Sequence, residues 1–222
     1  MSNNEETYPV SIKGEITEPL SRALWLVKWL LAIPHYIILA FLWIAFAVVT
    51  IMAFFAILFT AKYPRGLFDF NLGVLRWSWR VGFYSCQVLG TDKYPPFTLK
   101  STDYPADVEI DYSERLSHGL VLVKWFLAIP HYAVLAFLVG GASQSWKNSS
   151  MAGGFEQFGN GSFMNGGLLS LLVLFAAIVL LFSKKYPKDI FKLVMGINRW
   201  LFRVIAYVSL MVDKYPPFRL WD

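Results

Sequence analysis

The stretch from Tyr36 to Ala61 reads "YIILAFLWIAFAVVTIMAFFAILFTA" and contains no charged residue. About 20 consecutive apolar residues are enough for a helix to cross the hydrocarbon core of a bilayer, and this stretch is longer. A second uncharged stretch, "GLLSLLVLFAAIVLLF", runs from Gly167 to Phe182. Charged residues make up only 16% of the chain, whereas a soluble domain carries about 25%. The sequence therefore predicts an integral membrane protein.

The segment that leads into the first apolar stretch is repeated later in the chain. "LVKWLLAIPHY" begins at Leu26, and "LVKWFLAIPHY" begins 96 positions later at Leu122. "KYPRGLF" at Lys62 matches "KYPKDIF" at Lys185, now 123 positions later. The difference locates an insertion of 27 residues between the two repeated motifs. We predict a tandem duplication with repeats at 8–98 and 104–220, the second carrying a loop insertion at about 139–166.

The insertion favours two membrane crossings in each half. It reads "GGASQSWKNSSMAGGFEQFGNGSFMNGG", which is typical of a loop, and loop backbone cannot face lipid. In the first half, residues 21–61 as one helix would be about 60 Å long, twice the hydrocarbon thickness. By analogy between the halves, we expect a tight hairpin turn at Leu42–Ala45. The predicted crossings are Ser21–Trp43, Ala45–Ala61, Ser117–Val139 and Gly167–Phe182.

Two crossings per half would return the chain to its starting side and leave the halves parallel. Of the 20 lysines and arginines, only Lys147 lies in the insertion, so the positive-inside rule predicts cytoplasmic termini and an external insertion. An alternative is a third crossing at Phe68–Leu89, which would invert the second half. Asp69, Arg76 and Arg80 within that segment count against it.

A third helix in each half has an amphipathic pattern. Gly73, Arg76, Arg80 and Tyr84 recur at steps of three and four residues, which places them on one stripe. The pattern predicts an interfacial helix that lies on lipid or packs beneath the hairpins, with its arginines as candidate contacts to headgroups or a partner. A dedicated anionic-lipid or partner-binding site and a charge-lined pore are the alternatives. The second half repeats the stripe with Gly196, Arg199, Arg203 and Tyr207.

Two short segments outside the apolar stretches alternate in polarity and are expected to be extended on the cytoplasmic side. They are "YPVSIKGEI" and "YPADVEIDY", and pairing between them across the halves is one hypothesis. The predicted fold class is therefore an all-α integral membrane protein of two repeats. Each repeat would be a transmembrane helical hairpin plus an amphipathic interfacial helix, with these short extended segments.

The repeated motif suggests two kinds of polar residue near the membrane. Lys28 and Lys124 stand beside tryptophans and are expected to extend to lipid headgroups. The candidate intramembrane polar site comprises His35, His131, Tyr36 and Tyr132. Structural hydrogen bonding is the favoured interpretation. A proton or ion relay with the two imidazoles facing each other across a pseudo-twofold axis is the alternative.

Other chemistries have little support in the sequence. Two histidines are too few for a closed metal site, so we predict no metal and no cofactor. Cys86 is the only cysteine, and no motif of a known catalytic class is present, so no catalytic residue is expected. The net charge of +5 is spread too thinly to favour nucleic acid, although it suits anionic lipid.

Four motifs in the first half carry a family resemblance. They are Pro34-His35, the passage "AILFTAKYPRGLFDF", Arg76-Trp77 and "DKYPPF" from Asp92. With them the chain resembles the bacterial membrane family catalogued as domain of unknown function 4389, in two tandem copies. The second copy keeps the Pro-His, Tyr-Pro, Arg-Trp and "DKYPPF" elements. The resemblance implies a bacterial cell membrane and supplies no catalytic residue.

The leading functional hypothesis is a non-enzymatic scaffold or accessory subunit of a membrane assembly. Its expected partners are membrane lipids and other membrane-protein subunits or further copies of the chain, with no nucleic acid. One alternative is a small transporter or channel with a site between the halves near His35 and His131. A second is a protein that binds or senses anionic lipid. We expect a multi-pass protein of the bacterial inner membrane.

Overall fold

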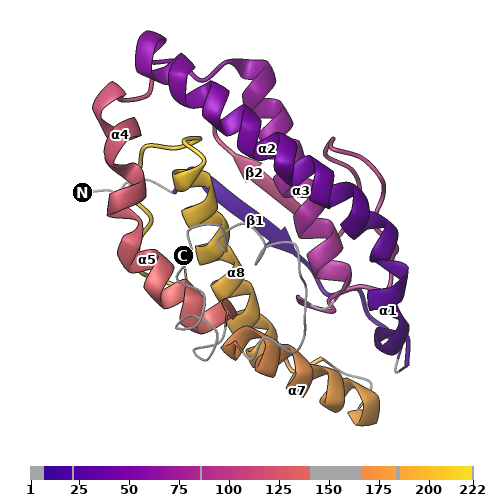
Figure 1. Cartoon of the computed structure of the whole chain (residues 1–222). Coiled ribbons are helices and arrows are strands. Elements are labelled where there is room, and N and C mark those ends of the chain that lie inside the picture. The colour runs from indigo at the N-terminus through magenta and orange to yellow at the C-terminus, as the bar shows by residue number, and fades with distance from the viewer. Residues whose placement is uncertain (1–7, 22, 86, 141–166, 184–185, 222) are drawn as a thin grey trace, which may run out of the picture.

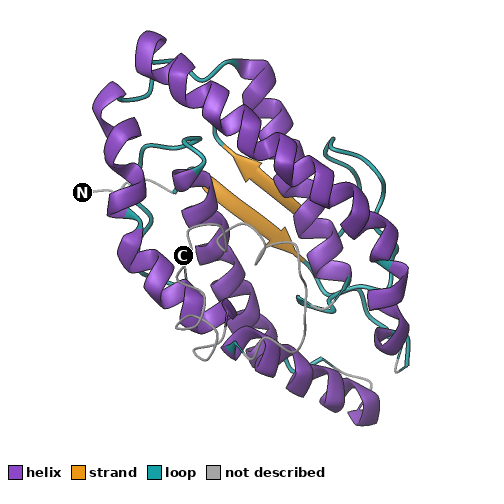
Figure 2. Ribbon diagram, viewed as in Figure 1, coloured by secondary structure: helices purple, strands orange, loops and turns teal. Residues whose placement is uncertain are grey.

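The computed structural model describes residues 8–21, 23–85, 87–140, 167–183 and 186–221. This part of the chain is mostly helical and contains one two-stranded sheet (Figure 2). The first half comprises β1 (Val10–Gly14), α1 (Trp25–Leu31), α2 (Ile33–Thr60) and α3 (Arg65–Tyr84). The second comprises β2 (Ala106–Ile110), α4 (His118–Leu127), α5 (Ile129–Leu135), the π-helical turn η1 (Ala136–Gly140), α7 (Leu168–Ser183) and α8 (Lys188–Val208).

The two strands pair across the halves, as hypothesised from their sequences. They run antiparallel, with Ile12 opposite Val108 at the centre and Val10 opposite Ile110 at one end. Ile12 and Val108 are also equivalent positions of the two repeats, 96 residues apart. Antiparallel strands paired about equivalent residues have a local twofold axis perpendicular to the sheet. This pseudo-twofold axis relates the two halves of the molecule.

The predicted hairpin turn at Leu42–Ala45 is wrong. Helix α2 runs through these residues without a break, and the only interruption of the rod formed by α1 and α2 is at Ala32. The break precedes Pro34, which has no backbone N–H and is therefore tolerated in the first turn of α2. Beyond Pro34 the stretch contains no glycine or proline that would end the helix.

The insertion in the second half does not mark a reversal of the chain either. A Cβ atom on Gly167 would lie 2.5 Å from the carbonyl oxygen of Val139, so the chain returns beside the point where it left. By the repeat offsets, Val139 and Gly167 correspond to the adjacent residues Trp43 and Ile44 of α2. Helix α7 therefore continues from η1 rather than folding back along α5 (Figure 1). Residues 141–166 lie outside the described part, and their external position stays a prediction.

Helices α3 and α8 lie inside the frame made by the apolar helices. Each packs on its own apolar helix, α3 on α2 and α8 on α7, and each contacts one strand of the sheet (Figure 1). The end of α2 also meets the start of α4, where the amide of Leu116 donates to the carbonyl of Ala61 at 2.8 Å. Near that junction the rings of Phe54 and Trp125 stack at 5.7 Å.

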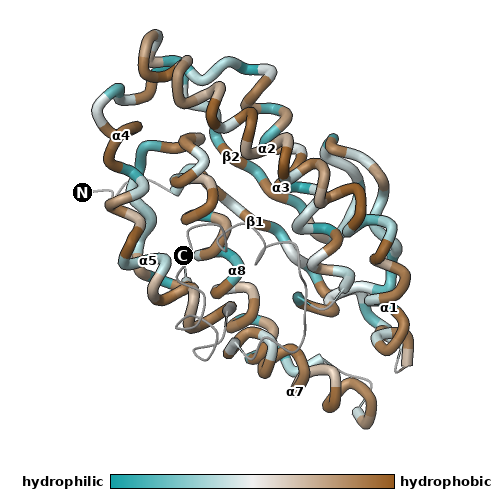
Figure 3. The backbone as a smooth tube through the Cα atoms, viewed as in Figure 1, coloured by the Kyte–Doolittle hydropathy of each residue, from teal (hydrophilic) through white to brown (hydrophobic). Residues whose placement is uncertain are grey.

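The apolar helices are hydrophobic along most of their length (Figure 3), and the large side chains on their outer faces are exposed. On α2, Phe41, Ile44 and Phe59 are 70%, 64% and 78% exposed, whereas His35, Leu39, Phe46, Ala53 and Ile57 are buried on the opposite face. Residues Ile33–Thr60 and His118–Val139 are long and apolar enough to cross a membrane, and α7 is a shorter apolar helix. This surface supports association with a membrane.

Candidate functional site

The candidate site occurs twice and is built around the "DKYPPF" turns, which we name the closing segments (91–98 and 212–219). The ammonium group of Lys28, 1% exposed, lies 2.7 Å from the carboxylate of Asp92 and donates to the carbonyl of Thr91 at 2.6 Å. Asp92 also accepts a hydrogen bond from the amide of Ser21 at 2.6 Å. The first closing segment is thus tied to the start of α1.

The second half reproduces this arrangement. Lys124 is fully buried, lies 2.7 Å from Asp213 and donates to the carbonyl of Val212 at 2.8 Å, while Asp213 accepts from the amide of Ser117. The prediction that both lysines extend to headgroups is therefore wrong. Each closing segment folds back over its lysine and offers a carboxylate and a carbonyl, which replace water around the ammonium group.

The pKa values of Asp92 and of the nearby Tyr84 both depart from their ordinary values. Burial alone would raise the pKa of Asp92, but the hydrogen bonds from Lys28 and Ser21 and the lysine charge hold that pKa below its ordinary value. The ring of Tyr84 lies 5.3 Å from the ammonium of Lys28. Burial, together with Tyr94 and Asp92, raises the pKa of Tyr84.

His35 lies between α3 and the closing segment and is fully buried. Its Nδ1 accepts a hydrogen bond from the indole of Trp77 at 3.0 Å, and its ring stacks on Phe97 with centroids 3.9 Å apart. The adjacent Tyr36 donates to Ser85 at 2.7 Å, and Tyr94 donates to the carbonyl of Leu31 at 3.2 Å. The Pro-His-Tyr motif thus holds α2, α3 and the closing segment together.

His131 makes the same contacts with residues of the second half. Trp200 donates to its Nδ1 at 3.1 Å, and its ring stacks on Phe218 at 4.0 Å. Tyr132 is 41% exposed. The two imidazoles occupy separate, equivalent sites, each among residues of its own half, and the hypothesis that they face each other is wrong. The physical reason is that each ring is held by its own tryptophan and closing segment.

Replacing His35 by phenylalanine should lower the free energy of unfolding by about 1–3 kcal/mol, because the buried indole N–H of Trp77 would lose its acceptor. Thermal unfolding of the protein in detergent measures this loss. Replacing His35 and Trp77 together by phenylalanine removes donor and acceptor at once and should recover part of it. Equal stability of the single variant and the wild type would contradict a structural role for the imidazole.

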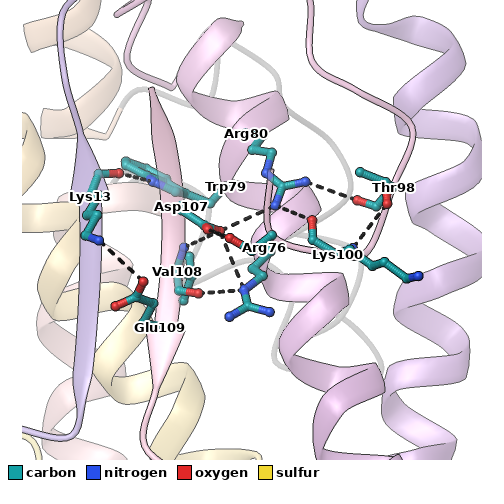
Figure 4. A network of polar contacts seen from close by, with 10 residues as sticks. Lys13, Arg76, Trp79, Arg80, Thr98, Lys100, Asp107, Val108 and Glu109 are labelled. Atoms are coloured by element: carbon teal, nitrogen blue, oxygen red, sulfur yellow. Dashed lines mark hydrogen bonds and ion pairs between the residues drawn. The ribbon is translucent and has the colours of Figure 1, made fainter. Parts of the chain in front are cut away.

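The arginine stripe of α3 faces the strand and the closing segment rather than lipid (Figure 4). Arg80 is fully buried and donates to the carbonyls of Thr98 and Lys100 at 3.2 and 2.6 Å. Arg76 donates to the carbonyl of Val108 at 2.8 Å, and Asp107 lies within 3.5 Å of both guanidinium groups. Burial lowers the pKa of Arg80, an effect that Asp107 partly offsets.

The arginines of the second stripe, on α8, donate hydrogen bonds to backbone carbonyls of residues 219–220. Arg199 donates to the carbonyl of Leu220 at 3.5 Å, and Arg203, 2% exposed, donates to that of Arg219 at 3.4 Å. The prediction that Arg80 and Arg203 contact lipid headgroups is therefore wrong, because both side chains are buried. Extended segments leave carbonyl groups without helix or sheet partners, and the guanidinium groups satisfy them.

Sequence reasoning missed Asp92, Trp77 and Phe97 and their counterparts as members of the site. The available signal was that "DKYPPF" and Arg-Trp recur together with the lysine and histidine, in both repeats. The assembled site contains hydrogen bonds, ion pairs and stacked rings. Within the described ranges, no group of three or more histidine, cysteine, aspartate or glutamate residues could hold a metal ion.

Comparison with known proteins gave one match. The family model described as "Domain of unknown function (DUF4389)" matches residues 22–98 and 164–219. These segments contain both "DKYPPF" turns, both Arg-Trp pairs and the first of the two Lys-Asp pairs. No curated protein and no solved structure matches the chain.

Proposed function

Since this chain belongs to the family described as Domain of unknown function (DUF4389), whose description states no activity, we propose a function from its surfaces and sites. The protein is a non-enzymatic, membrane-embedded scaffold or accessory subunit of a bacterial inner-membrane assembly. Its partners are membrane lipids and a second membrane protein or a second copy. Its termini lie on the cytoplasmic side, as the distribution of lysine and arginine favours.

One observation carries this proposal: the lysine, histidine and second arginine of each repeated motif are buried, while the outer faces of the apolar helices are exposed. Lys28, Lys124 and Arg80 are buried on internal carboxylates and carbonyls. By contrast, Phe41 and Phe59 of α2 and Phe126 of α4 are at least 70% exposed. A surface of this kind is stable only against lipid or an apolar partner.

The two alternatives have less support. A transporter needs polar groups along a shared path, and the two histidines, its main candidates, sit in separate sites on separate tryptophans. A lipid sensor that reads headgroups with the arginine stripe would need those groups at the surface, and Arg80 and Arg203 are buried.

Crosslinking in native membranes, followed by gentle detergent extraction and mass spectrometry, tests the proposal. We expect the protein to stay in the membrane fraction after an alkaline carbonate wash and to crosslink to a constant partner or to itself through α2 or α4. Phe41→Ser, on the exposed face of α2, should reduce crosslinking without unfolding the chain, and Leu39→Ser on the buried face serves as the unfolding control. Release by carbonate, or recovery only as an uncrosslinked monomer, would contradict the proposal.

A further inference from the structure

From the proposed membrane location and the symmetry of the fold, we infer that the protein inserts into a single leaflet from one side. Its apolar helices lie along the plane of the membrane, and the polar face of the strand pair faces water. The exposed apolar faces of these helices contact the acyl chains and headgroups of that leaflet. This inference rests on the proposed function and replaces the multi-pass route predicted from the sequence, together with the external position predicted for residues 141–166.

The first support is the length of the apolar surface. Exposed apolar side chains follow the rod of α1 and α2 from Leu26 (52% exposed) to Phe59 (78%), a span of 34 residues. At 1.5 Å per residue the span is about 50 Å, against a hydrocarbon core of about 30 Å. To fit by tilting, this span would need about 50°, and α2 alone, with 28 residues or about 42 Å, would need about 45°; both exceed the usual range of about 0–40°. A rod lying along the leaflet keeps its whole length in lipid.

The second support is the position of the pseudo-twofold axis. The axis passes between Ile12 and Val108, perpendicular to the sheet. Figure 1 looks onto the flat of the strands, and the helices run across the view in the plane of the sheet. If the helices crossed the bilayer, the axis would therefore lie in the membrane plane. A rotation about this axis would exchange the two leaflets. The strand pair, through which the axis passes, would then lie at the centre of the bilayer.

The side chains of the strand pair exclude that position. Val10, Ile12, Val108 and Ile110 are buried on one face, while Ser11, Lys13 and Glu109 on the other face are exposed. Lys13 and Glu109 form an ion pair of 3.3 Å with 65% and 53% of their side chains exposed. Exposed charges at the bilayer centre are strongly unfavourable. With the axis along the membrane normal, the same face points into water.

The closing segments have the composition of a water–lipid boundary, and they would lie at the same depth in the membrane in both halves. Tyr94 and Phe97 are 42% and 51% exposed, and their counterparts Tyr215 and Phe218 are 40% and 55% exposed. Each pair follows an exposed lysine of the same turn, Lys93 or Lys214. Aromatic rings with adjacent lysines are typical of the interface between water and lipid, and cytoplasmic leaflets are anionic. If the pseudo-twofold axis lies along the membrane normal, both closing segments lie at the surface of the same leaflet.

Single cysteines in a Cys86→Ser background test this arrangement in sealed membrane vesicles of known orientation. Three of the positions, Lys13, Lys62 and Lys93, are exposed lysines. Lys62 and Lys93 lie near opposite ends of the rod. The fourth position, Ile44, lies at the middle of the rod. A membrane-impermeant maleimide added on the cytoplasmic side should label all three lysine positions. Added on the other side, it should label none of them. Cysteine at Ile44 should stay unlabelled from both sides. Lys214→Cys is the matched control and should behave as Lys93→Cys does.

Each other pattern overturns the inference. Labelling of positions 62 and 93 from opposite sides means that the rod crosses the bilayer, and labelling of 93 and 214 from opposite sides means inverted halves. Labelling of position 44 from the far side means a hairpin whose tip reaches that surface. These outcomes leave the proposed function standing, provided that carbonate does not extract the protein. Extraction by carbonate defeats the proposed function itself, and the inference with it.

Discussion

Replacing Asp92 by alanine should lower the free energy of unfolding by about 3–5 kcal/mol, because it leaves the charge of Lys28 buried without a carboxylate. The remaining contacts of the ammonium, with the carbonyl of Thr91 and the ring of Tyr84, do not neutralise it. The closing segment should detach from α1, and the stacking of Phe97 on His35 should weaken with it. Chemical unfolding in detergent, followed by tryptophan fluorescence, measures the loss.

Two comparisons make this prediction specific. Lys28→Met combined with Asp92→Ala removes both charges and should recover much of the stability, and Asp69→Ala, at an exposed position of α3, should change it little. Because the pKa of Asp92 is lowered in the folded protein, its contribution is present above the ordinary aspartate pKa of about 3.9. That contribution is lost as the pH falls through the lowered value. Wild-type stability of the Asp92→Ala variant at neutral pH would contradict the role of the pair.

Replacing Trp79 by alanine should cost about 3–5 kcal/mol, the range for truncating a fully buried aromatic side chain. Trp79 packs edge-on to Phe202 of α8, with centroids 5.5 Å apart, and its indole donates to the carbonyl of Lys13 at 2.7 Å. One side chain thus joins α3, α8 and β1, which belong to both halves. We expect a lower unfolding midpoint and easier proteolysis between the halves.

Trp29→Ala is the matched control, since Trp29 is 53% exposed on α1. It removes the same side chain from a surface position and should leave the unfolding midpoint in detergent close to that of the wild type. A loss from Trp29→Ala as large as that from Trp79→Ala would contradict a core between the halves. It would show instead that the detergent-facing surface dominates stability.

The repeat pattern predicted that both halves would use the same motifs, and the alternating polarity of the two extended segments suggested the hypothesis that they pair, which the structure confirms. The repeat pattern also led to a wrong turn at Leu42–Ala45. The reasoning assumed that a polar insertion must leave the membrane at a point where the helix reverses. In the structure Val139 and Gly167 remain neighbours, so an insertion can interrupt a helix and leave its direction unchanged.

The site was predicted only in part. Lys28 and His35 were identified because a lysine and a Pro-His pair beside an apolar stretch are unusual. Their partners Asp92 and Trp77 lie 64 and 42 residues away along the chain, and no local pattern connects them. The same limit applied to Arg80, whose spacing placed it on a helical stripe without indicating what that stripe contacts.

The sequence by itself determined the duplication, the apolar character of the long helices and the amphipathic spacing of α3 and α8, because these follow from residue type and period along a single segment. Only the tertiary structure decided which way each polar side chain faces. A charge beside an apolar helix can be stabilised equally by water, by a headgroup or by a buried carboxylate. The choice depends on which distant segment returns to that place, and here the closing segments return to both lysines and both histidines.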